Sequence, residues 1–138
     1  MKRNFELTGG DFSDGGEIPR ECGYKNGNEA PLLRASGIPE GTKSLALIMD
    51  DPDAMGAVGK VWVHWVAWNI DPTKTELAKS TEGMTDFGEV GYGGPAPPDK
   101  IHTYVFKLYA LDSELKNKIK SLGGSVMSLS NDKIVLES

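Results

Sequence analysis

The sequence predicts a mainly β protein: a two-sheet antiparallel β-sandwich with Greek-key connections and one short C-terminal helix. Seventeen glycines and eight prolines divide the 138 residues into short apolar runs, as strands joined by turns require. The strongest of these runs combine β-branched and aromatic residues, which favour strands. Because the chain shows no internal repeat and no linker, we expect residues 1–138 to form a single domain.

Three strands are expected in the first third of the chain. Phe5–Leu7 is a short strand, followed by a loop at residues 8–16. Pro31–Ala35 is typical of an edge strand, because proline is tolerated there and further turn residues follow it. Ser44–Met49 is apolar on both faces, and its length favours a buried strand over a helix. It runs into the Asp50–Asp53 segment, where the proline ends the strand at the rim of a sheet.

Val61–Ile70 has the strongest strand signal in the chain. A period of two residues places one set of side chains on one face, namely Trp62, His64, Val66 and Trp68, and the alternate residues Val61, Val63, Trp65 and Ala67 on the other. Both faces are apolar, so we expect a central strand.

The rest of the chain is expected to hold two strands and a helix. Residues 71–86 and 88–98 are predicted to be loops. His102–Leu111 is predicted to be a strand, and its residues His102, Tyr104, Phe106 and Leu108 share one face. Ser113–Leu122 has helical spacing with a serine cap, and Lys133–Glu137 is predicted to be a closing strand.

The composition excludes several classes of protein. The net charge is −5 and no dense Lys/Arg run is present, so we expect no nucleic-acid partner. The single cysteine, Cys22, forms no internal disulfide. The basic N-terminus lacks the apolar segment of a signal peptide, and no run approaches the ~20 apolar residues of a membrane span. We therefore expect a cytoplasmic protein without a transmembrane segment.

Two histidines and two aspartates are the polar groups that stand out. His64 and His102 lie in predicted strands, whereas Asp51 and Asp53 lie in the turn after a buried strand. Each has an ordinary explanation, since a lone strand histidine is commonly a hydrogen-bonded core residue and Asp-Pro often starts a turn. The functional alternative is that a carboxylate accepts one ring N–H of a histidine, which orients the other ring nitrogen toward a ligand.

The sequence also contains residues that bear on three other kinds of site. Residues 91–94 (GYGG) could offer backbone amides to an anion, although they match no nucleotide-binding motif. The His/Asp set would suit zinc or iron, but no close ligand spacing is present, so no metal and no cofactor are expected. No nucleophile motif such as G-x-S-x-G is present, so an acyl-transfer enzyme is not expected.

An ordered set of motifs resembles the phosphatidylethanolamine-binding protein family, and in particular its bacterial and archaeal branch related to Raf kinase inhibitor protein. The motifs are Asp51-Pro52-Asp53-Ala54, Val63-His64-Trp65-Val66, Asn69-Ile70, Asp86-Phe87-Gly88, Gly91-Tyr92-Gly93-Gly94-Pro95-Ala96-Pro97-Pro98 and His102-Thr103-Tyr104. The similarity runs from Ile18 to Leu111. Any one motif alone is weak, but their order is specific.

The resemblance implies a β-sandwich with a small pocket for phosphate-like or acetate-like anions. It assigns four residues to that pocket, Asp51, Asp53, His64 and His102, and implies that it is lined by Trp62, Gly91, Gly93, Pro97, Pro98 and Tyr104. The implied function is a non-catalytic binding or regulatory protein for phosphate or phospholipid headgroups, with a kinase or serine protease as a protein partner and a homodimer as the assembly. The alternative is a metal-assisted hydrolase using the His/Asp cluster.

The chain departs from the family pattern in three places. Met55 stands where the family usually has proline, and Thr103 stands where it usually has arginine. The segment 77–86 is shorter than usual. If the missing arginine pairs with an aspartate in the family, that carboxylate has lost a partner here.

Overall fold

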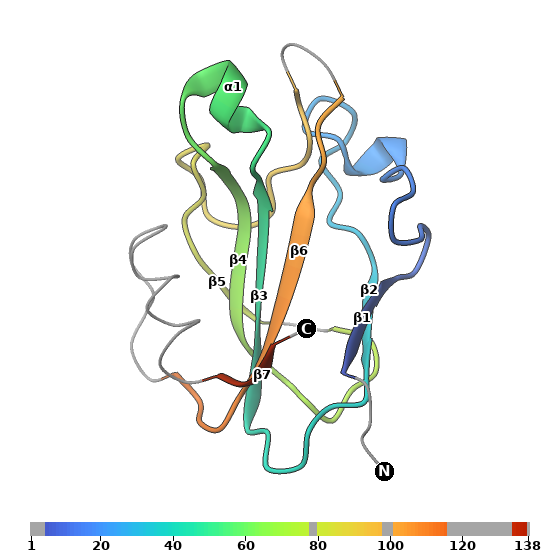
Figure 1. The fold of residues 1–138 in the computed structure, drawn as a ribbon, viewed down its shortest axis with the longest axis vertical. Coiled ribbons are helices and arrows are strands. Elements are labelled where there is room, and N and C mark those ends of the chain that lie inside the picture. Colours follow the sequence, from blue (N-terminus) through green and yellow to red (C-terminus); the bar gives the residue numbers. More distant parts are fainter. Residues whose placement is uncertain (1–4, 78–79, 98–100, 116–133, 138) are drawn as a thin grey trace.

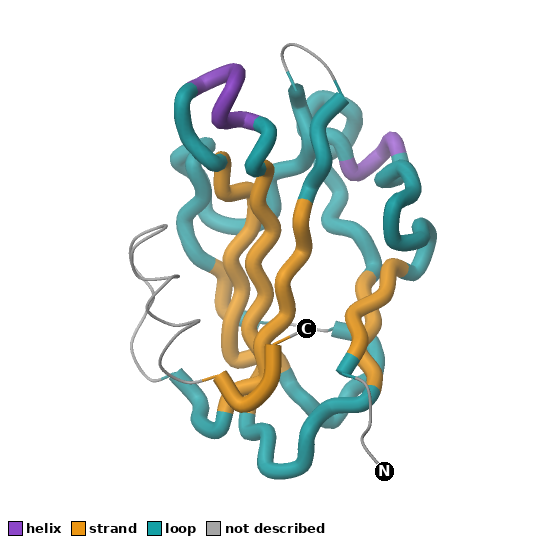
Figure 2. Tube along the Cα trace, in the orientation of Figure 1, coloured by secondary structure: helices purple, strands orange, loops and turns teal. Residues whose placement is uncertain are grey.

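Two antiparallel sheets make up most of the computed structural model, which describes residues 5–77, 80–97, 101–115 and 134–137. The smaller sheet pairs β1 (Glu6–Gly9) with β2 (Leu33–Ser36). The larger sheet has the order β5-β4-β3-β6-β7, comprising β5 (Thr81–Glu82), β4 (Trp62–Ile70), β3 (Ser44–Asp51), β6 (Val105–Leu111) and β7 (Ile134–Glu137). Figures 1 and 2 show the smaller sheet set apart from β3, β4 and β6.

This architecture confirms the prediction of a mainly β, antiparallel protein. The predicted strands at residues 5–7, 31–35, 44–49, 61–70, 102–111 and 133–137 correspond to β1, β2, β3, β4, β6 and β7 with shifted ends. The Greek-key sandwich stays a prediction. Residues 116–122 of the predicted C-terminal helix lie outside the described residues, as does Lys133.

The hydrophobic core has two parts because β3 is buried along its whole length. Alternate β3 side chains belong to different clusters: Leu45 and Leu47 to the first, Ala46 and Ile48 to the second. The first cluster joins the two sheets and consists of Phe5, Leu33, Ala35, Leu45, Leu47, Ala67, Ile70, Leu108 and Ala110. Burying each such leucine stabilises the fold by about 1.5–3 kcal/mol. The apolar character of both faces of residues 44–49 is thereby explained.

The strict alternation predicted for β4 is wrong, because the strand contains two β-bulges. Met49 pairs with Trp65 and Asp50 with Val63, so His64 is an extra residue on β4. A second shift in the pairing register of the two strands lies between Leu45 and Leu47 of β3. On β4 it falls at Asn69, whose φ is 55°. After His64 the faces exchange: Val66 and Trp68 join the second cluster with Val63, while Ala67 and Ile70 join the first.

Three segments also differ from their predicted structure. The turn after β3 contains a five-residue helix, α1 (Ala54–Val58), which ends at Gly59 in a left-handed conformation with φ 79°. The predicted loop 71–86 contains the short strand β5. His102 precedes β6 instead of lying within it. The helix α1 and the segment leading into β6 lie at the same end of the large sheet (Figure 1).

Candidate functional site

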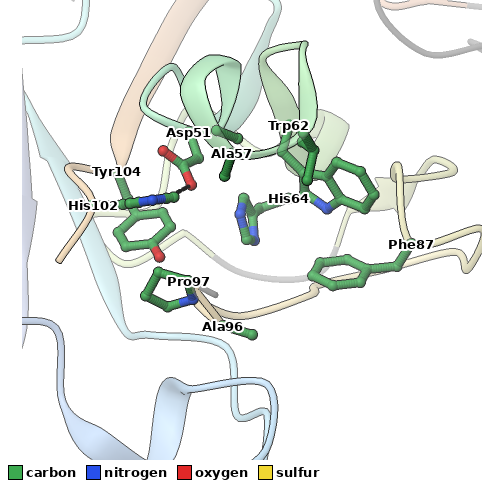
Figure 3. A pocket seen from close by; sticks show the side chains of 11 residues that line it. Asp51, Ala57, Trp62, His64, Phe87, Ala96, Pro97, His102 and Tyr104 are labelled. Carbon is green, nitrogen blue, oxygen red and sulfur yellow. Dashed lines mark hydrogen bonds and ion pairs between the residues drawn. The ribbon is translucent and has the colours of Figure 1, made fainter. Parts of the chain in front are cut away.

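A cavity of about 150 Å³ opens at the end of the large sheet beside α1. Its walls come from β3, α1, β4, the loop after β5 and the segment that leads into β6. The residues that line it are Asp51, Ala54, Ala57, Val58, Trp62, His64, Phe87, Ala96, Pro97, His102 and Tyr104 (Figure 3). Most of these side chains are apolar, so the few polar groups decide what the cavity can bind.

Asp51 and His102 form a buried pair on one side of the cavity. Asp51 is the last residue of β3, and only 4% of its side chain is exposed, against 1% of the His102 side chain. Nδ1 of His102 lies 2.5 Å from Oδ2 of Asp51, and Oδ1 accepts the Asp53 N–H at 2.9 Å. Because a carboxylate accepts here, Nδ1 of His102 carries the proton and the ring orientation is fixed.

His64 faces the same cavity from β4 and is held by a different acceptor. Its Nδ1 lies 2.7 Å from the carbonyl oxygen of Gly93, whose N–H in turn donates to the His64 carbonyl at 2.8 Å. The rings of Phe87 and Tyr104 pack against the imidazole edge-on, with centroids 5.3 and 5.2 Å away. Burial lowers the pKa of His64 below its ordinary value, and the Gly93 carbonyl and Asp51 oppose this effect only in part.

Asp53 lies outside the cavity and stabilises its wall through a hydrogen bond. Its side chain is exposed, and Oδ2 accepts the N–H of Thr103 at 2.8 Å. The bond ties the residues beside His102 to the start of α1, where Asp53 occupies the N-cap position without a capping hydrogen bond. At the position where the family usually has arginine, the Thr103 backbone therefore supplies a partner for this carboxylate.

The glycine-rich segment plays a structural part, because three of its N–H groups are bonded within the protein. That its amides bind an anion stays a prediction. The N–H groups of Gly91, Gly93 and Gly94 donate to Gly83 O, His64 O and Asn28 Oδ1. Their distances are 3.1, 2.8 and 2.7 Å, and none of these glycines lines the cavity. An anion in the cavity would meet side chains instead.

Phe87 is a wall residue that the sequence analysis placed in the motif Asp86-Phe87-Gly88 but did not assign to the pocket. Asp86 anchors it beside β4, because Oδ2 of Asp86 accepts the Val63 N–H at 2.7 Å and its own N–H donates to Val63 O at 3.0 Å. The Phe87 ring stacks on Tyr24 at 4.3 Å and meets Trp62 edge-on at 5.6 Å. An aromatic residue inside a polar loop was the available signal.

The structure brings together six of the ten predicted site residues as cavity lining: Asp51, Trp62, His64, Pro97, His102 and Tyr104. Asp53 and Gly93 hold these residues in place, and Gly91 lies apart. Pro98 lies outside the described residues. Sequence reasoning missed Phe87, Ala96 and the three α1 residues Ala54, Ala57 and Val58.

Among the described residues that line the cavity there is no lysine or arginine. The nearby Lys60 and Lys107 are paired with Asp86 and Asp50, at 2.7 and 2.9 Å. Within the ranges that the structure describes, no group of three or more His, Cys, Asp or Glu side chains is arranged to hold a metal ion. In those same ranges, no helix combines the length and apolar character needed to cross a membrane.

An antiparallel β fold with a small histidine-containing cavity is the class of protein that these observations define. The family model described as phosphatidylethanolamine-binding protein matches residues 8–135, and the chain belongs to this family. It is 44% identical over 115 residues to a UPF0098 protein of Methanothermobacter thermautotrophicus, covering 75% of this chain and 74% of that protein.

Two solved structures share the fold. A crystal structure of a phosphatidylethanolamine-binding protein homologue from Chlamydia trachomatis has a TM-score of 0.88 and 31% identity, covering 99% of this chain and 94% of the other. The crystal structure of Escherichia coli YbcL, a member of the mammalian family, has a TM-score of 0.85 and 32% identity, covering 96% and 93%. The family predicted from the ordered motifs is confirmed, and so is the mainly β, antiparallel fold.

Proposed function

We propose that this protein is a non-catalytic binding protein whose cavity holds a phosphate-like anion or a phosphate-bearing headgroup. The observation that carries the proposal is the Asp51–His102 pair set beside His64 in one small, largely apolar cavity. Membership of a family of binding proteins supports it. The volume of about 150 Å³ suits a small anion or headgroup.

The polar edge of the cavity can bind a small anion through hydrogen bonds. In His64 Nδ1 is engaged with the Gly93 carbonyl oxygen, so Nε2 is the position of this ring that a ligand would meet. Apolar walls of Trp62, Phe87 and Pro97 lower the local dielectric, and hydrogen bonds with a charged partner are stronger there.

Titration calorimetry with inorganic phosphate and with O-phosphoethanolamine tests the proposal. A hydrogen bond to a charged group contributes about 1.5–3 kcal/mol, so His102→Ala should weaken binding by roughly ten-fold or more. Glu40→Gln, a change at an exposed residue of a turn far from the cavity, is the matched control and should bind like the parent. Equal affinity in His102→Ala and the parent would refute the proposal.

Inhibition of a kinase or serine protease is a finer proposal that rests on the family resemblance. An inhibition assay with His102→Ala separates the two activities, because inhibition through surface loops would survive loss of the cavity group. For the alternative of a metal-assisted hydrolase, no observation on the described residues favours it over binding. Elemental analysis of the purified protein for zinc, iron and manganese tests that alternative.

A further inference from the structure

We infer that Asn28 is a positioning residue for the cavity: it holds two peptide groups that fix the ring orientation of His64. The inference rests on the proposed function, since it concerns how the same cavity is prepared for its ligand. Asn28 is half-buried and is not among the described residues that line the cavity. Its effect on a ligand therefore passes through the backbone of residues 92–94.

Asn28 and His64 lie on opposite sides of two successive peptide groups. The first group joins Tyr92 to Gly93. Its C=O accepts a hydrogen bond from Asn28 Nδ2 at 3.1 Å, and its N–H donates to the His64 carbonyl oxygen at 2.8 Å. The second group joins Gly93 to Gly94. Its N–H donates to Asn28 Oδ1 at 2.7 Å, and its C=O lies 2.7 Å from Nδ1 of His64.

The second peptide group decides which nitrogen of the His64 ring faces the cavity. A carbonyl oxygen can only accept a hydrogen bond, so Nδ1 carries a proton toward Gly93 and the opposite side of the ring points into the cavity (Figure 3). The N–H and C=O of a trans peptide group point in opposite directions, so a bond to one fixes the other. Because residues 93 and 94 are both glycine, the group would rotate easily without Asn28.

The turn that carries Asn28 is attached to the same segment by other bonds. Oη of Tyr92 donates to the Cys22 carbonyl oxygen at 2.8 Å, and the Tyr24 N–H donates to the Pro95 carbonyl oxygen at 3.0 Å. Neither bond uses the Asn28 side chain. Removing that side chain should therefore leave the turn in place and release only the peptide groups beside His64.

Asn69 is a matched control for Asn28. Its φ is 55°, against 54° for Asn28, and it is also half-buried. Its side chain likewise makes two backbone bonds, because Nδ2 donates to the Leu115 carbonyl oxygen and Oδ1 accepts the Leu115 N–H, both at 2.8 Å. It lies near the end of β4 remote from Trp62 and the cavity. Glycine at either position removes two hydrogen bonds and keeps the positive φ accessible.

Long-range ¹H–¹⁵N NMR spectra of the intact protein at pH 8 show which ring nitrogen of His64 carries the proton, and His102→Ala assigns the signals of the two histidines. In the parent the proton should lie on Nδ1. The ratio of the Nδ1–H form to the Nε2–H form should fall about five-fold in Asn28→Gly, the equivalent of one hydrogen bond. Asn69→Gly should keep the parent ratio.

Asn28→Asp tests partial rescue, because a carboxylate still accepts from the Gly94 N–H but cannot donate to the Tyr92 carbonyl oxygen. Its tautomer ratio should lie between those of Asn28→Gly and the parent. Asn69→Asp is its control and should keep the parent ratio. A role confined to stability would affect the variants at both positions alike and would leave the His64 tautomer unchanged.

Titration calorimetry with inorganic phosphate gives the second measurement, in which Asn28→Gly should bind about five-fold more weakly than Asn69→Gly. Equal tautomer ratios, or equal affinities, in these two variants overturn the inference and leave the proposed function standing. If Asn28→Gly does not fold, a parent ratio in Asn28→Asp overturns it. A parent protein that binds no phosphate refutes the proposed function, and the tautomer ratio then decides the inference alone.

Discussion

Removing the Asp51 carboxylate should destabilise the fold as well as the site. Asp51 satisfies two donors at once, the ring N–H of His102 and the backbone N–H of Asp53. In Asp51→Ala both donors lose their acceptor. The His102 side chain is 1% exposed, so water cannot replace the carboxylate at the ring.

The expected loss can be worked from these two bonds. A buried donor left without a partner costs about 1–3 kcal/mol, and the exposed Asp53 amide adds about 0.5–1.5 kcal/mol. Asp51→Ala should therefore lose about 1.5–4.5 kcal/mol, a large part of a typical stability of roughly 5–15 kcal/mol. Asp51→Asn should lose less, because its amide oxygen still accepts one of the two bonds.

Urea unfolding followed by the fluorescence of Trp62, Trp65 and Trp68 measures this loss. With a slope of about 1.5 kcal/mol per molar urea, a change of about 3 kcal/mol moves the midpoint by about 2 M. Asp71→Ala is the control, since this exposed aspartate bonds only within its own turn, to Thr73. If Asp51→Ala shifts the midpoint no more than Asp71→Ala, the structural role assigned to the pair is wrong.

Two further predictions concern backbone packing and pH. Gly94→Ala should destabilise the protein by about 3 kcal/mol or more, because its Cβ would lie 1.9 Å from the Cys22 carbonyl oxygen. Gly56→Ala, in open space on α1, should instead stabilise the protein by about 0.4–1 kcal/mol. Thermal unfolding that ranks the two variants in the opposite order would contradict this. Because the pKa of His64 is lowered from 6.5 in the folded protein, the unfolded chain binds more protons below that pH, and stability should fall as the pH decreases from 6.5 toward the folded pKa. The midpoint in urea should therefore drop more between pH 7.5 and pH 5 in the parent than in His64→Gln, and an equal drop would show that His64 does not contribute.

Much of the fold could be predicted because the relevant signals are local. Residues 44–49 and 61–70 are rich in apolar, β-branched and aromatic residues, and both became central strands. The helix α1 gave no such signal, since it has five residues, contains Gly56 and is formed by its position between β3 and β4. The bulges at His64 and Asn69 depend on pairing with β3, which a periodic pattern does not contain.

The site was predictable to the extent that it consists of unusual residue types. The chain has two histidines, and both line the cavity beside Asp51. Phe87, Ala54 and Ala57 could not be found in this way, because alanine and phenylalanine serve equally well in any apolar wall. The glycine segment is ambiguous for a related reason. Glycine permits several roles, and here Gly94 fits closely against the Cys22 carbonyl.

Because of the bulge in β4, the residue that lines the cavity is not needed for pairing in the sheet. His64 is surplus to the pairing of β4 with β3, since Met49 and Asp50 find partners on either side of it. The ladder therefore places no demand on this residue, which faces the cavity. A chain from which His64 was deleted could pair more regularly than the natural one, yet it would have no imidazole in the cavity and no second link to Gly93. Under the proposed function, substitutions at this position are expected to change what the cavity binds while the pairing of β4 with β3 is kept.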